Sequence, residues 1–189
     1  MRAVVAAPVR TQPADVAMVI DTVTRGGAER VLISLANGLD RERFRVHVIT
    51  TRDRGDFADE LAPHVSVHSL HRTTRWDLAA MRRFAKLTDH LGVQLVHTHS
   101  HSAAYFVRLA GALHGRRWRH VMHDHHGPVE GSFALRLADR LLLRHVDYYF
   151  AVSDRLARYA TESLGVPATR AERLANGVDV GQAPNAERT

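Results

Sequence analysis

Short apolar runs and amphipathic stretches alternate along almost the whole chain. The run VAMVIDTV, residues 16–23, is nearly all apolar and of strand length, which is typical of a strand buried on both faces. The next stretch, 27–39, repeats apolar residues at helical spacing and begins at two glycines, so it predicts a helix. The same alternation predicts strands over 44–51, 65–70, 93–99, 118–124 and 147–153, and helices over 56–62, 77–91, 102–114, 133–145 and 154–164.

This alternation predicts an α/β fold. Each parallel strand pair requires a crossover, and the intervening helix supplies it. We expect a doubly wound, mostly parallel, Rossmann-like sheet of six to seven strands with helices on both faces. The expected domain covers 15–179. Residues 1–14 read as a loose N-terminal arm and 180–189 as a tail or the start of an interdomain linker, because both are rich in proline, alanine and polar residues.

The composition indicates in which cell compartment the protein is expected and which partners are not expected. No run reaches the ~20 apolar residues that span a membrane, and the first residues lack a secretory signal pattern, so we expect a cytoplasmic protein. The lack of cysteine excludes disulfides and thiolate metal sites. The net charge of +6 comes almost wholly from arginine, but no nucleic-acid-binding motif accompanies it, and we expect no nucleic acid partner.

The loop TRGG follows the first strand, at the sheet edge where ligands bind in such folds. Gly26 and Gly27 let the backbone approach a ligand closely, and the free N–H groups of the first helical turn favour an anion such as a diphosphate. Arg25 adds a positive charge. The alternative is a tight strand-to-helix turn without a ligand, which two glycines also satisfy.

A first histidine-rich segment, VHTHSHS (96–102), follows the fourth strand. Its three histidines alternate, so a continued strand would place them on one face and suggest zinc. A helix that begins at Ser100 or Ser102 would instead turn His101 away from the other two. We favour this second interpretation, a polar strand end with no metal.

A second segment, HDHHG (123–127), follows the fifth strand and leaves the sheet at the same edge. Neutral imidazole both donates and accepts hydrogen bonds and titrates near neutral pH, so it suits sugar hydroxyls and proton transfer. The alternative is a set of loop histidines that face water.

A basic stripe follows on the next helix. Arg136, Arg140 and Arg144 are spaced by four, and such a stripe suits peripheral contact with the anionic inner face of a membrane. A solvated helix face is the alternative.

Five segments form a series along the chain: GGAERVLISLANGL (26–39), VHTHSHSAAYFVRLAG (96–111), VMHDHHG (121–127), DYYFAVSDRLARY (147–159) and LANGVD (174–179). In this order they resemble the N-terminal domain of GT-B glycosyltransferases, in particular glycosyltransferase family 4. The resemblance implies one half of a GT-B fold, on the acceptor side of a retaining enzyme. Such an enzyme transfers a sugar from a nucleotide-diphosphate sugar to a small-molecule, glycan or lipid-linked acceptor, without a metal or resident cofactor.

The resemblance also assigns roles to residues. Gly26 and Gly27, with Arg25, correspond to the loop that approaches the donor diphosphate. His126 corresponds to the catalytic histidine that reaches the transferred sugar or the acceptor, with His123 as the second candidate. By their place at the same edge, the expected acceptor-binding residues are His99, Ser100 and His126. Ser153 resembles a structural N-cap serine, and the turn at 176–177 resembles the approach to the interdomain linker.

The chain departs from the family pattern in length. Family members hold the nucleotide-sugar mainly with a second Rossmann-like domain, which this sequence does not include. We therefore expect little or no activity from the chain alone, and a C-terminal donor domain as its partner in cis or in trans. Two other hypotheses stay open: a non-catalytic binding or assembly module that pairs with a donor-binding chain, and a histidine-based metal hydrolase.

Overall fold

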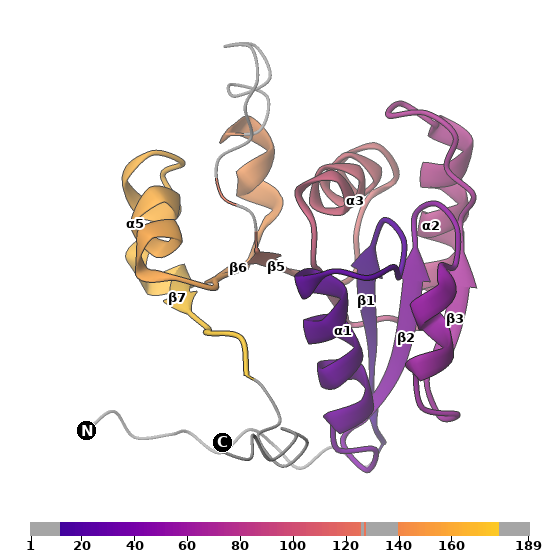
Figure 1. The fold of residues 1–189 in the computed structure, drawn as a ribbon. Coiled ribbons are helices and arrows are strands. Elements are labelled where there is room, and N and C mark those ends of the chain that lie inside the picture. The colour runs from indigo at the N-terminus through magenta and orange to yellow at the C-terminus, as the bar shows by residue number, and fades with distance from the viewer. Residues whose placement is uncertain (1–11, 126, 128–139, 178–189) are drawn as a thin grey trace, which may run out of the picture.

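A computed structural model describes residues 12–125, 127 and 140–177. Within them, seven strands form one sheet in the order β3-β2-β1-β4-β5-β6-β7, and every pairing is parallel (Figure 1). The strands are β1 (Ala14–Ile20), β2 (Phe44–Thr50), β3 (Ser66–Ser69), β4 (Leu95–Thr98), β5 (Arg119–Asp124), β6 (Tyr148–Ala151) and β7 (Ala171–Arg173). The predicted α/β class and parallel sheet are confirmed.

The helices begin where the sequence offers a cap. Asp77, Ser100 and Ser153 each accept a hydrogen bond from a backbone N–H in the first turn of α2, α3 and α5, so the predicted cap at Ser153 is confirmed. The helices are α1 (Gly27–Gly38), η1 (Asp56–Glu60), α2 (Leu78–His90), α3 (His101–His114), η2 (Leu143–His145), α5 (Asp154–Glu162) and η3 (Ala168–Arg170).

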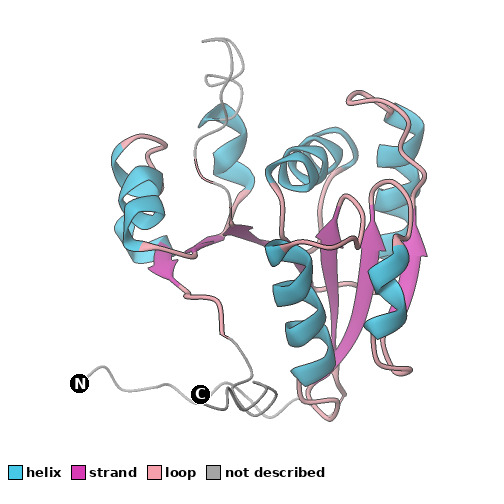
Figure 2. Ribbon diagram, viewed as in Figure 1, coloured by secondary structure: helices cyan, strands magenta, loops and turns pink. Residues whose placement is uncertain are grey.

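Helices lie on both faces of the sheet (Figure 2). Residues 16, 18 and 20 of β1 pack with α1, whereas residues 17 and 19 pack with α2 and α3. This alternation follows from the two-residue period of a strand, and it explains why β1 is almost wholly apolar. A third apolar cluster joins α3 to β6 and α5.

The strand order reverses between β1 and β4, because β1 pairs with β2 on one side and with β4 on the other. In open α/β sheets the crevice at such a switch point, beyond the carboxyl ends of the strands, is the usual ligand site. β5 is the next strand along. All three predicted site segments therefore follow strands that are neighbours in the sheet.

Several predicted elements differ from the structure. The helix expected at 56–62 is the 3-10 helix η1, and the short strand β7 was not among the expected strands. Of the helix expected at 133–145, the structure describes a helical turn at 140–142 and the 3-10 helix η2, since residues 128–139 lie outside the described part. β1 begins at Ala14, inside the range expected to be a loose arm. Among the described helices, none has the length and apolar character that crossing a bilayer requires.

Candidate functional site

The amino terminus of α1 stands at the carboxyl edge of the sheet. Gly26 is its extended N-cap, and Gly27 is the first helical residue. A methyl group added at Gly27 would meet no atom within 4 Å, whereas one at Gly26 would clash with the Glu29 carboxylate. The predicted helix start at two glycines is thus observed, and the space beside Gly27 is open to a ligand.

Arg25 lies beside this helix start and is exposed. Its guanidinium lies 5.3 Å from the ring centroid of Phe57 in η1, and Arg30 lies 5.2 Å from the same ring. Arg30 is also paired with Glu60 at 2.5 Å. Arg25 has no carboxylate within ion-pair distance among the described residues, so its charge is available to an anion.

The ends of β4 and β5 bring three histidines together. His97 and His99 have ring centroids 4.2 Å apart, and the ring of His123 lies 5.6 Å and 5.5 Å from theirs. All three side chains are buried. They share the α1 face, because His97 is the register partner of Met18, which packs toward α1.

These histidines are held in their neutral form. Burial, aided by the neighbouring histidines, lowers the pKa of His97 to about 3 and that of His99 well below its ordinary value. Burial lowers the pKa of His123 as well. His120, in the same histidine-rich stretch, is separate: its ring nitrogen lies 3.0 Å from the Thr98 hydroxyl, on the other face of the sheet.

Asp124 ends β5 and anchors the loop that follows. Its buried carboxylate accepts hydrogen bonds from the Tyr149 hydroxyl at 2.5 Å and the Gly127 backbone N–H at 3.0 Å, and His101 Nε2 lies 3.0 Å from it. Burial would raise the pKa of this carboxyl, but these partners together lower it well below its ordinary value. Gly127 has a φ of 86°, which favours glycine.

A second, partly buried network ties β1 to the loop after β3 and to α3. Asp21 accepts hydrogen bonds from Thr51 at 2.6 Å, from Arg72 at 2.8 Å and from Ser100 at 3.2 Å. Arg72 also donates to Ser102 at 2.8 Å. Sequence reasoning missed Asp21 and Arg72. The position of Asp21 directly after an apolar strand was a usable signal, but nothing near Arg72 marks it as buried.

The other predicted site residues do not all lie where they could contact a ligand. Ser100 is the N-cap of α3 as well as a donor to Asp21, so one lone pair of its hydroxyl is left to accept a further hydrogen bond. His99 is fully buried. His101 turns into α3, as the predicted helix start requires. The first-ranked catalytic candidate, His126, and the basic residue Arg136 lie outside the described residues.

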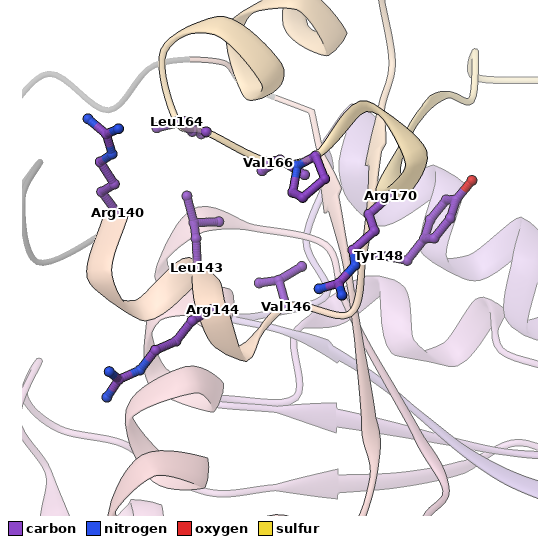
Figure 3. A pocket seen from close by; sticks show the side chains of 10 residues that line it. Arg140, Leu143, Arg144, Val146, Tyr148, Leu164, Val166 and Arg170 are labelled. Atoms are coloured by element: carbon purple, nitrogen blue, oxygen red, sulfur yellow. The ribbon is translucent and has the colours of Figure 1, made fainter.

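Arg140 and Arg144 line a cavity of about 330 Å³ at the opposite edge of the sheet, where β6 and β7 begin. Figure 3 shows them on the two sides of Leu143, with Arg170 reaching toward Val146. Within the described residues none of the three arginines is paired with a carboxylate. The cavity is therefore basic, and it lies away from the carboxyl edge.

Comparison with known proteins places the chain in a family. Residues 25–182 match the family model Glycosyltransferase Family 4. The chain belongs to glycosyltransferase family 4. No curated protein sequence matches it significantly.

Solved structures share the fold of this family 4 chain. A glycosyltransferase from Rickettsia africae has 16% identity and a TM-score of 0.71, covering 88% of this chain and 44% of its own. Anabaena HepE, solved with UDP and glucose, has 22% identity and a TM-score of 0.66, covering 88% and 45%. The lipopolysaccharide galactosyltransferase WaaB has 12% identity and a TM-score of 0.65, covering 92% and 50%. The chain thus spans half or less of the length of these proteins.

Proposed function

We propose that the chain is the N-terminal, acceptor-side half of a retaining glycosyltransferase that uses a nucleotide-diphosphate sugar. The observation that carries this proposal is the helix start at Gly26 and Gly27, with open space beside Gly27, at the switch point of a parallel sheet in a family 4 chain. UDP-glucose is the first donor to test, because HepE was solved with it.

The donor diphosphate docks at the amino terminus of α1. The first-turn N–H groups carry the positive end of the helix dipole, and the absent Cβ of Gly27 leaves room for phosphate oxygens. Arg25 adds a full positive charge, and its stacking on Phe57 orients the guanidinium. Glu29 lies over Gly26 and swings away when the diphosphate arrives, because a carboxylate and a phosphate repel each other.

The acceptor and the transferred sugar lie at the ends of β4 and β5. In the proposal His126 and His123 are the catalytic histidines, and His99, Ser100 and His126 bind the acceptor, which is a small molecule, a glycan or a lipid-linked sugar. Neutral imidazole suits this role, since it offers one donor and one acceptor to sugar hydroxyls. Asp124 supports the site by fixing the start of the loop.

Transfer requires a second, donor-binding domain, in cis or in trans. Closure of a cleft between two domains excludes water and brings donor and acceptor together, so the chain alone has little or no activity. The protein works in the cytoplasm, without a metal in the transfer step. Arg140, Arg144 and Arg136 contact the inner face of the membrane, and the exposed Leu141 beside them suits an amphipathic surface.

An NMR titration tests the donor site on the chain itself. We expect UDP to shift the backbone amides of the first turn of α1, and Gly27→Val to abolish those shifts by filling the open space. Gly38→Val is the matched control, because Gly38 also has no atom within 4 Å of an added methyl but lies at the other end of α1. Equal shifts in Gly27→Val and Gly38→Val would refute the proposed donor site.

A further inference from the structure

Three buried histidines meet at the ends of β4 and β5. We propose that His97, His99 and His123 form a binding site for one divalent transition-metal ion of the zinc type. Each side chain offers one ring nitrogen, and the three nitrogens lie within 4.8 Å of one another.

The backbone geometry makes this site compact. His97 and His99 alternate along one chain segment and so point to the same face, and β5 brings His123 onto that face from the neighbouring strand. Ligand nitrogens around a tetrahedral zinc ion are about 3.3 Å apart, given Zn–N bonds of about 2.0–2.1 Å. The three nitrogens, which lie within 4.8 Å of one another, must therefore approach by up to about 1.5 Å, and we propose that rotation of the side chains supplies this movement.

The burial of these rings leaves polar atoms unsatisfied. Nε2 of His97 and both ring nitrogens of His99 are buried, and no described residue hydrogen-bonds to them. Buried polar atoms are almost always paired, because an unpaired one loses its bonds to water without replacement. A metal ion supplies a partner for the lone pair of each ring.

The ligand type selects the ion. Three imidazoles without a coordinating carboxylate suit zinc, cobalt, nickel or copper and do not suit magnesium or calcium. The ring of His125 lies 4.2 Å from that of His123, so either this ring or a water fills the fourth position. The buried Asp124 carboxylate is the nearby negative charge that offsets the ion.

The site has a structural role in the proposal. An ion bound there would link β4 to β5 directly below the carboxyl edge, since His97 and His99 come from one strand end and His123 from the other. It would hold the two histidine segments in place and take no part in the transfer, and His99 and His123 would each keep their second ring nitrogen for a sugar hydroxyl. Metal binding can therefore be measured with no donor or acceptor present, so its failure is distinct from a failure of the proposed function.

The experiment uses the full chain, purified without an affinity tag or chelator. Elemental analysis measures bound zinc, and titration with Co²⁺ reports tetrahedral nitrogen ligation through its visible absorption. The variants are His99→Gln, which removes a ligand, and His120→Gln, a control that removes an equally buried histidine from the other face of the sheet.

We expect about one zinc ion per chain, and an affinity reduced by at least roughly 100-fold in His99→Gln and little changed in His120→Gln. Absence of stoichiometric binding by the folded wild-type chain would overturn the proposal and leave water as the partner of these nitrogens. Unchanged binding in His99→Gln would overturn it as well. If His99→Gln does not fold, X-ray absorption of the wild-type zinc complex decides, because fewer than three imidazole ligands contradicts the site.

Discussion

One hydrogen bond to the Asp124 carboxylate can be removed without changing the packing around it, which allows a quantitative prediction. Tyr149→Phe removes the hydroxyl that donates to Asp124 at 2.5 Å but keeps the buried ring in place. No cavity forms, so the loss is that of a hydrogen bond to a buried charge. Such a bond contributes about 1.5–3 kcal/mol to the free energy of unfolding.

For a chain of this length we expect the melting temperature to fall by roughly 4–8 °C, taking about 2 kcal/mol as the loss. Urea denaturation gives the change in free energy directly. Tyr148→Phe is the control, since the neighbouring hydroxyl donates to Glu172 at 2.8 Å on the exposed surface, where the expected cost is about 0–1 kcal/mol. Equal losses in Tyr149→Phe and Tyr148→Phe would refute the reasoning.

The same bond predicts a pH dependence. The folded chain holds the pKa of Asp124 below its ordinary value of 3.8, so the carboxylate stabilises the fold fully above that value. This stabilisation is lost as the pH falls through the lowered pKa, where the native carboxyl is protonated. The stability difference between wild type and Tyr149→Phe should therefore be constant from pH 7 to about 5 and should shrink in acid below 3.8. A difference that grows in acid would contradict the assignment.

Three further predictions concern the stability of the fold. Gly55→Ala should destabilise the chain in thermal melts by more than about 2 kcal/mol, because the φ of Gly55 is 78° and the added methyl would clash with the backbone after β1. Gly92→Ala is the control: the φ of Gly92 is 63° but the space beside it is open, so the loss should be only about 1 kcal/mol. Arg72→Met should cost about 1–3 kcal/mol in urea denaturation, since the partly exposed Asp21 loses its cation but keeps its other two hydrogen bonds. A loss below about 1 kcal/mol would contradict the network. Ser153→Ala should cost about 1 kcal/mol, because the hydrogen bond that caps α5 is lost. An unchanged melting temperature would contradict a stabilising role of this cap.

Local patterns predicted most of the elements, because burial on both faces and helical spacing leave a direct trace in the sequence. The start of α1 at Gly27 and the caps at Ser100 and Ser153 follow from residues adjacent in the chain. Short-range rules also explain what was missed: β7 has only three residues, two of them exposed, so it shows no apolar run.

The contacts that build the site were harder to predict, because they join residues distant in the chain. Arg72 reaches Asp21 across 51 positions, and no periodicity marks that pair. The histidine cluster exists only because β4 and β5 are neighbours, a strand order that the sequence pattern does not specify. The sequence therefore showed these histidines as two separate segments, 96–102 and 123–127, and did not indicate that His97, His99 and His123 meet in one cluster.

The most direct test of the central proposal measures sugar transfer and its stereochemistry. The chain, with its donor-binding domain in cis or added as a separate chain, is given nucleotide-diphosphate sugars and candidate acceptors, and NMR follows the anomeric configuration. We predict transfer with retained configuration that Gly27→Val abolishes and Gly38→Val preserves. Inverted product, or transfer that survives Gly27→Val unchanged, would contradict the proposal.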